Sequence, residues 1–270
     1  MLAWQERTCL LVGEEKLEAF RAATVIIVGT GGVGGYAAEM ICRAGVGNMV
    51  LIDSDTVSVS NINRQLLAMT STIGKSKVRV LEARLKDINP DVNITVIEQY
   101  LTPENIPALL TPIVEAAAGQ SFAGRIFFGA AQCPENKLTG RTLPGLFLVD
   151  AIDTLAPKLA LIDFCVKNGI GHVSSMGSGA KFDVTQVRIA DISKSYNCPL
   201  AYIVRKRLRR EYGISKGFKV VFSEELPDKD AIIAEEGRNK KSNVGTISYL
   251  PAVFGCACAQ VAVSFLMENA

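Results

Sequence analysis

Two basic side chains, Arg64 and Lys77, are the residues of this chain best suited to act on a phosphate. Arg64 stands between Asn63 and Gln65 in a polar turn, and Lys77 follows the sequence Gly-Lys-Ser at 74–76. A preorganised arginine or lysine stabilises the charge that develops on a pyrophosphate leaving group. Charged residues in a turn are also commonly solvated and nothing more. The clustering of both cations with Asn63 and Gln65 favours a site for a triphosphate.

Two acidic residues, Asp53 and Asp153, come at the ends of apolar runs that predict buried strands at 48–52 and 146–150. Open parallel sheets bind ligands outside the carboxyl ends of their strands, where both residues are expected. Asp53 would accept hydrogen bonds from ribose hydroxyls, or it only forms a turn. Asp153 could hold Mg²⁺ against phosphates. Asp150 is either a second group around that metal or a helix start, and we favour the helix start.

A glycine-rich turn is the third feature that indicates a nucleotide. Its glycines are Gly29, Gly31, Gly32 and Gly34. It lies between an apolar run at 25–28 and good helix formers at 35–44, so backbone N–H groups and a helix N-terminus can approach a phosphate closely. NAD, FAD and ATP enzymes all use this pattern, and Asp53 suits NAD and ATP equally. The cations at Arg64 and Lys77 favour ATP, because a triphosphate concentrates more negative charge.

The elements that position these residues follow the β-α-β order of a doubly wound sheet. We expect strands at 25–28, 48–52, 92–98, 146–150, 172–174, 187–190 and 218–222. We expect helices at 5–22, 35–44, 76–88, 101–110, from beyond 153 to 169, and at 199–212, with a charged loop at 224–243. The predicted fold class is therefore α/β: a Rossmann-like doubly wound sheet with an appended C-terminal α+β part, in one compact unit.

The composition excludes some classes of protein. The 270 residues carry a formal net charge of +2, so contact with nucleic acid must depend on a local patch. Seven scattered cysteines without a C-x-x-C pair suit a reducing cytoplasm and argue against a tetracysteine zinc site. Charged residues near the N-terminus argue against a signal peptide. The nearly uncharged stretch 248–267 predicts a helix buried in the core or in a subunit interface, so we expect no membrane contact.

These motifs together resemble the adenylating enzymes of the ubiquitin-activating superfamily, which include the ThiF/MoeB-type activators of sulfur-carrier proteins. The resemblance rests on the glycine turn, Asp53, 61–65, 74–77 and 150–153. Further blocks resemble the tRNA threonylcarbamoyladenosine dehydratase branch, at 174–185, 190–195 and 198–201. The resemblance covers nearly the whole chain except 113–145, which we interpret as an insertion or flap. The missing C-x-x-C pairs fit this branch better than the sulfur-carrier activators.

The resemblance implies an ATP-dependent reaction on tRNA. The carboxylate of a threonylcarbamoyl group, on the adenosine next to the anticodon, is adenylated with loss of pyrophosphate. The acyl-adenylate then closes to a cyclic oxazolone as AMP leaves, and the net change is the loss of one water. Because the nucleophile belongs to the substrate, the reaction requires phosphate positioning and charge neutralisation more than a catalytic cysteine.

The resemblance also implies a role for each site residue. Arg64, Lys77, Asp153 and Arg7 would be catalytic, with Arg7 reaching across a homodimer to the partner's phosphates. The ATP-binding residues would be Gly29, Gly31, Gly32, Gly34, Asp53, Asn63, Arg64, Gln65, Lys77 and Asp153. Asp153 would hold Mg²⁺, and a monovalent cation (K⁺ or Na⁺) is expected with ligands that the sequence does not place. Residues 1–155 would form the ATP-binding half, and residues 156–270 the half for substrate binding and dimerisation.

A basic helix at 199–212 is the expected contact for tRNA. It carries Arg205, Lys206, Arg209 and Arg210, opposite an apolar face formed by Leu200, Ile203, Val204 and Leu208. A run of charge is usually a solvated face, but so many like charges on a nearly neutral protein suit a tRNA-phosphate patch. The resemblance also leaves room for a sulfur-relay protein as a partner.

Several alternatives stay open at this point. Cys198 precedes a helix start and either accepts an acyl or sulfur group or, as we favour, packs there. His172 lies in an apolar strand, where a structural role is the commoner one. The chain could instead adenylate the C-terminal glycine of a small sulfur-carrier or ubiquitin-like protein. An NAD-dependent oxidoreductase would explain the glycine turn and Asp53 but not the cations.

Overall fold

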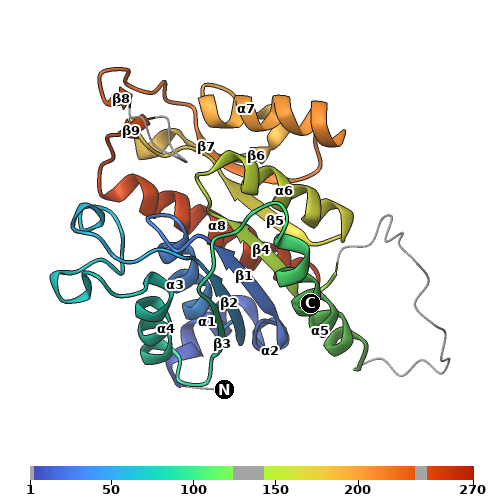
Figure 1. Ribbon diagram of the computed structural model, residues 1–270. Helices are drawn as coiled ribbons and strands as arrows, with labels where there is room; N and C mark the ends of the chain where they lie inside the picture. Colours follow the sequence, from blue (N-terminus) through green and yellow to red (C-terminus); the bar gives the residue numbers. More distant parts are fainter. Residues whose placement is uncertain (1–2, 124–142, 235–241) are drawn as a thin grey trace.

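The computed structural model describes residues 3–123, 143–234 and 242–270. Its centre is a seven-stranded sheet in the order β3-β2-β1-β4-β5-β7-β6 (Figure 1). The strands are β1 (Thr24–Val28), β2 (Asn48–Ile52), β3 (Asn93–Ile97), β4 (Leu146–Asp150), β5 (Gly171–Ser175), β6 (Val187–Asp191) and β7 (Lys219–Ser223). All of them pair in parallel except β6, which runs antiparallel to β7. The predicted α/β class with a Rossmann-like sheet is confirmed.

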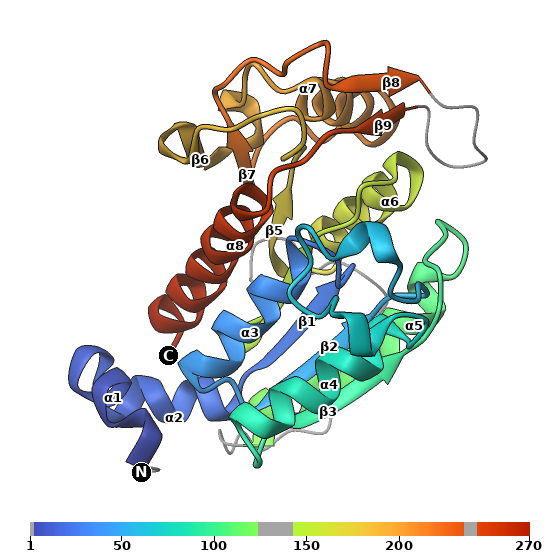
Figure 2. The ribbon, with the colours of Figure 1, turned by 90° about the vertical axis from the view of Figure 1, so that its left-hand side faces the viewer.

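Helices cover both faces of this sheet (Figures 1 and 2). They are α1 (Glu6–Val12), α2 (Glu14–Ala22), α3 (Gly34–Ala44), α4 (Lys77–Ile88), α5 (Ile106–Ala123), α6 (Leu155–Lys167), α7 (Pro199–Arg207) and α8 (Tyr249–Glu268). Val25 and Ile27 of β1 face the core formed with α2, α3, α4 and α8. Ile26 and Val28 face α5 and α6 on the other side. Because both faces are covered, every residue of β1 is buried, and this explains its continuous apolar sequence.

The C-terminal part continues the same sheet. β5, β7 and β6 extend it beyond β4, and α6 and α7 share a core with β7. α8 returns to pack against α3, where Gly255 permits close approach: a Cβ on Gly255 would lie 2.5 Å from the Val33 carbonyl oxygen. These contacts join the two halves of the chain into one unit, as the sequence predicts.

Three sequence-based expectations need correction. The helical lead-in at 5–22 is interrupted at Gly13, whose φ of +88° separates α1 from α2. The helix expected at 101–110 begins at Ile106 and passes Pro112, so residues 113–123 of the predicted insertion continue α5. Residues 124–142 of that insertion lie outside the described residues. The charged loop at 224–243 contains a two-stranded hairpin, β8 (Ile232–Ala234) and β9 (Ser242–Val244).

α8 occupies the stretch for which the sequence predicts a buried helix. Among the described residues, it is the one helix long and apolar enough to cross a membrane, judged by length and composition. Half of its most apolar window is buried within the protein, against α3 and the sheet. One side of the helix belongs to the core, and Tyr249, Cys256 and Gln260 are exposed on its other side.

Candidate functional site

The glycine turn lies where the order of the strands reverses, between β2 and β4 on either side of β1. The strand ends Val28, Ile52 and Asp150 are in register, so the segments that follow them meet at one edge. Gly29 has a φ of +85°, and a Cβ there would lie 2.8 Å from the Ala151 carbonyl oxygen. A Cβ on Gly34 would lie 1.7 Å from the Gly29 carbonyl oxygen. The turn is therefore closed so tightly that only glycine fits these two positions.

The segment 61–65 and α8 form the other wall of the turn. A Cβ on Gly32 would lie 3.1 Å from Pro251 of α8 and 3.3 Å from the Arg64 carbonyl oxygen. A Cβ on Gly31 would lie 3.5 Å from Nε2 of Gln65. The structure thus brings the predicted glycines and the predicted polar turn together. The N-terminus of α3, which begins at Gly34, faces the same place.

Asp53 is fixed to the glycine turn by hydrogen bonds. Its Oδ2 accepts from the Thr30 backbone N–H at 2.7 Å and from the Thr30 hydroxyl at 3.0 Å. Its Oδ1 accepts from the Asp55 N–H at 2.9 Å. An ionised carboxylate has about four positions for accepting hydrogen bonds, so one is left for a ribose hydroxyl. Asp53 therefore forms a turn and is also placed to bind ribose. Its partner Thr30 was not predicted from the sequence.

Arg64 is held in place by its neighbours. Its Nη1 donates to Asn63 Oδ1 at 2.8 Å and to the Ser60 carbonyl at 2.9 Å. Asn63 in turn donates from Nδ2 to the Thr246 carbonyl at 3.0 Å, between β9 and α8. Within the described residues, these contacts occupy Nη1 and leave the other N–H groups of the guanidinium for a ligand. Asn63 therefore orients Arg64 and links this segment to the C-terminal half.

Gln65 is buried, and its Oε1 has no hydrogen-bond partner among the described residues. The Thr154 hydroxyl, directly after Asp153, is likewise buried without a partner in the described part of the chain. Buried polar atoms are normally paired, so both oxygens favour a polar ligand at this edge. The donor and acceptor set of the site therefore fits a nucleotide.

Lys77 begins α4 and is buried, and its Nζ lies 2.7 Å from Asp55 Oδ2. Asp55 itself is 63% exposed in its side chain. Asp55 was not predicted as a site residue, although its place two positions after Asp53 was an available signal. A phosphate bound beside Lys77 would share this ammonium group with Asp55.

Asp150 is the last residue of β4 and starts no helix, which corrects our interpretation of it. Its carboxylate is fully buried and accepts from Lys158 Nζ at 2.7 Å and from the Ser174 hydroxyl at 2.5 Å. It also accepts from the Ile152 N–H at 3.1 Å. The buried pair of Asp150 and Lys158 thereby anchors the loop that carries the exposed Asp153. No three metal-ligating side chains come together within the described residues, so Mg²⁺ at Asp153 would take most of its ligands from phosphates and water.

Arg7 is not part of this cluster. It lies on α1, two residues after Gln5, whose amide packs against Gly45 at the C-terminal end of α3. The glycine turn is at the opposite end of α3, which has 11 residues and spans about 16 Å at 1.5 Å per residue. α1 accordingly lies at the far end of α3 in Figure 2. The structure therefore places Arg7 away from the predicted ATP site of its own chain.

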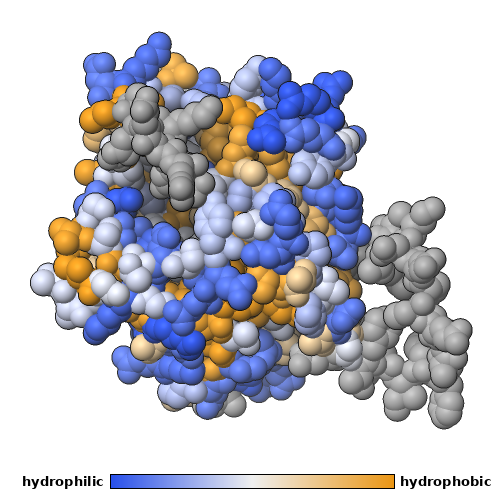
Figure 3. Space-filling model, in the orientation of Figure 1, coloured by the Kyte–Doolittle hydropathy of each residue, from blue (hydrophilic) through white to orange (hydrophobic). Residues whose placement is uncertain are grey.

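The basic helix is present as α7 and one following π-helical turn, Leu208–Tyr212, and ends at Gly213. Figure 3 shows hydrophilic surface over the C-terminal part of this helix. Val204 and Leu208 are buried as predicted, whereas Ile203 is exposed. Arg210 forms an ion pair with Glu211, which also pairs with Arg207.

The cations of the basic helix are therefore not equivalent. The hydrogen bond from Arg207, followed by that from Arg210, lowers the pKa of Glu211 to about 2. In the described part of the chain, no carboxylate pairs with Arg205, Lys206 or Arg209. Glu211 occupies Arg207 and Arg210, so these three are the cations of the helix that are left for an anionic ligand.

His172 and Cys198 have the surroundings of structural residues. The His172 ring stacks on Phe218 with centroids 5.0 Å apart, and its Nδ1 lies 3.0 Å from the Ile170 carbonyl. Burial lowers the pKa of His172. Cys198 is 3% exposed and lies in the apolar core beneath α7. These surroundings fit the packing roles that we favoured for both.

Comparison with known proteins identifies the family. The model of the ThiF family matches residues 5–118. The tRNA threonylcarbamoyladenosine dehydratase of Bacillus subtilis is 36% identical over 243 residues, covering 90% of this chain and 82% of the relative. The Escherichia coli dehydratase is 32% identical over 288 residues, covering 99% and 96%. The chain belongs to the tRNA threonylcarbamoyladenosine dehydratase family.

A crystal structure of the Escherichia coli dehydratase in complex with ATP extends this likeness to the fold. It superimposes with a TM-score of 0.79 at 31% identity, covering 99% of this chain and 96% of that one. The family membership expected from the motifs is thus confirmed over nearly the full length. Sequence reasoning missed Thr30, Asp55, Thr154 and Lys158, and it gave Ser174 no individual role within the block 174–185.

Proposed function

We propose that this chain catalyses the ATP-dependent dehydration of N6-threonylcarbamoyladenosine next to the anticodon of tRNA. The observation that carries the proposal is the meeting of the glycine turn, Asp53, Arg64 and Gln65 at one edge of the sheet. The likeness to dehydratases across both halves of the chain supports the substrate. It also favours tRNA over a sulfur-carrier protein.

ATP would lie along the strand ends of β1, β2 and β4. The remaining acceptor position of Asp53 suits the ribose, and the unpartnered Oε1 of Gln65 suits a donor of the nucleotide. The glycine turn and the N-terminus of α3 would receive a phosphate. Arg64, oriented by Asn63, and Lys77 would neutralise the charge of the leaving pyrophosphate.

The proposed reaction has two steps. First, a carboxylate oxygen of the threonylcarbamoyl group attacks the α-phosphorus, and the bond from that phosphorus to the β-phosphate oxygen breaks. Second, the carbonyl oxygen of the carbamoyl group attacks the activated carboxyl carbon and closes the ring. A carbamoyl N–H gives up its proton, and AMP departs with the former carboxylate oxygen. The chain's own groups position the phosphates and hold charge in both steps. The buried pair of Asp150 and Lys158 keeps the Asp153 loop in place throughout.

Other groups complete the proposal. Asp153 would hold Mg²⁺, which neutralises phosphate charge when bound. A homodimer would let Arg7 act on the phosphates of the partner's site, because it cannot reach its own. Residues 1–155 would then bind ATP, and residues 156–270 would bind the substrate and contribute to dimerisation. A monovalent cation, K⁺ or Na⁺, a sulfur-relay partner and a cytoplasmic location belong to the same proposal.

The direct test supplies both candidate substrates. The purified protein is incubated with ATP and either tRNA carrying threonylcarbamoyladenosine or a sulfur-carrier protein, and nucleosides and AMP are analysed. We expect AMP and a nucleoside lighter by one water with tRNA alone. AMP formation that depends on the carrier protein, with the nucleoside unchanged, would replace the proposal by the alternative activity.

A further inference from the structure

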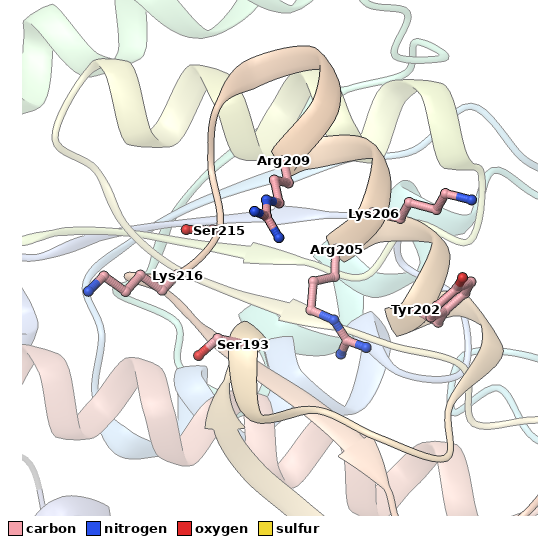
Figure 4. A pocket seen from close by; sticks show the side chains of 7 residues that line it. All are labelled: Ser193, Tyr202, Arg205, Lys206, Arg209, Ser215 and Lys216. Carbon is pink, nitrogen blue, oxygen red and sulfur yellow. The ribbon is translucent and has the colours of Figure 1, made fainter.

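A pocket of about 470 Å³ lies between the basic helix and two loops of the C-terminal half (Figure 4). The helix contributes Tyr202, Arg205, Lys206 and Arg209, while the loops contribute Ser193 and Lys216. Its size is within the range of pockets that hold small ligands. The pocket shares no residue with the ATP site.

The charges in this pocket are unbalanced. Arg205 and Arg209 are four residues apart and are therefore neighbours on the helix surface. Two like charges in this arrangement repel each other and destabilise the helix. Figure 4 shows both guanidinium groups turned toward the loops that carry Ser193 and Lys216. None of the four cations lining the pocket has an ion-pair partner in the described part of the chain. An anion between them would relieve their repulsion.

The walls of the pocket are fixed by hydrogen bonds that leave these cations available. Asp191 Oδ1 accepts from the Ser193 N–H at 2.9 Å and from its hydroxyl at 2.6 Å, and Oδ2 accepts from the Gly217 N–H at 2.7 Å. One carboxylate therefore ties both loops together. Arg205 donates from Nη1 to the Ser195 hydroxyl at 2.8 Å and to its carbonyl, which sets the direction of its guanidinium. The pocket is thus built before any ligand binds.

An exposed aromatic ring adjoins the cations. Tyr202 is 56% exposed and lines the same pocket. Aromatic rings beside arginine and lysine are the usual arrangement for single-stranded nucleic acid, because bases stack on the ring while the cations follow the backbone. A free phosphate ion carries no base that could stack on the ring. The ring therefore favours a phosphate that belongs to an RNA strand.

We propose that this pocket binds a backbone phosphate of the tRNA, between Arg205 and Arg209 of the helix and Lys216 of the facing loop, with a nucleotide base against Tyr202. The inference rests on the proposed tRNA substrate. It limits the RNA contact of the basic helix to the side that carries Arg205 and Arg209. Arg210 and Arg207, which pair with Glu211, contribute little to it. Lys216, which lies outside the predicted helix, joins the RNA-binding surface.

Binding of an unmodified anticodon stem-loop RNA tests the pocket without the chemical reaction. Its dissociation constant is measured at several salt concentrations for the full-length protein and for Lys216→Ala, Arg209→Ala and the double variant. Each removed phosphate contact should reduce the slope of log affinity against log salt by about 0.7, the value for single strands, and the double variant should bind roughly tenfold more weakly. Lys167→Ala, an exposed lysine on α6, is the matched control and should bind normally.

Two further measurements separate the outcomes. At saturating tRNA, the pocket variants should keep the wild-type turnover and raise KM, whereas loss of the proposed function would abolish turnover in the wild-type protein as well. Inorganic phosphate should compete with the RNA only at high concentration. If Lys216→Ala and Arg209→Ala bind the stem-loop with wild-type affinity and salt slope, the pocket is not an RNA site. If the two variants lose binding of inorganic phosphate but bind the stem-loop normally, the pocket binds a free anion and the inference is wrong.

Discussion

Asp53 offers a quantitative test of the nucleotide site, because its carboxylate has a countable set of hydrogen bonds. Three come from the protein, two of them from Thr30 at 2.7 and 3.0 Å and one from the Asp55 N–H at 2.9 Å. Asp53→Asn keeps the size of the side chain but replaces one acceptor oxygen by an NH₂ group. The amide cannot satisfy Thr30, Asp55 and a ribose hydroxyl together.

The expected loss follows from one charged hydrogen bond to ribose. Such a bond contributes about 1.5–3 kcal/mol, and about 1.4 kcal/mol corresponds to a tenfold change in affinity. ATP should therefore bind roughly 10- to 100-fold more weakly to Asp53→Asn in isothermal titration calorimetry. Thr30→Val is the control: it removes the 3.0 Å hydroxyl contact and leaves the ribose position intact, so ATP affinity should change only a few-fold. An ATP dissociation constant within threefold of wild type for Asp53→Asn would refute the ribose assignment.

Three other variants test the remaining parts of the account. Arg64→Ala should lower AMP release by about 10²–10³-fold without changing the melting temperature, because its contacts are exposed; near-normal turnover would remove it from the mechanism. Lys158→Met should lower the free energy of unfolding, measured in urea, by about 3–5 kcal/mol, because it leaves Asp150 buried without its cation. Adding Asp150→Asn to this variant should restore much of the loss. Equal stability of the single and the double variant would contradict the coupling. Cys198→Ala should keep turnover within a few-fold of wild type, as a packing residue would, and an inactive but folded variant would indicate a covalent role.

The fold was predictable where the pattern of apolar residues has one explanation. Continuous runs such as Val25–Val28 can be satisfied only by burial on both faces, and the structure places them at the centre of the sheet. The end of α5 was not predictable, because residues 113–123 show no clear helical period and the helix continues past Pro112, where a helix usually ends. The β8–β9 hairpin was missed because its charged surroundings are typical of a loop.

The candidate site was predictable in its residue types but not in its pairings. Asp53, Arg64 and Gln65 follow from the motifs, and the structure brings them to one edge. The ion pair of Lys77 with Asp55 depends on how two loops meet, and no local pattern encodes it. Arg210 resembles its neighbours in the sequence, and only its distance from Glu211 separates it from the cations of the pocket.

The central claim is that the carboxylate of the threonylcarbamoyl group is adenylated. The most direct measurement uses tRNA in which that carboxylate is labelled with the heavy isotope of oxygen, followed by mass spectrometry of the released nucleotide. Adenylation predicts one labelled oxygen in AMP and none in pyrophosphate, because the acyl carbon leaves its oxygen on the α-phosphorus. ADP together with labelled inorganic phosphate would show attack at the γ-phosphorus instead and would contradict the account.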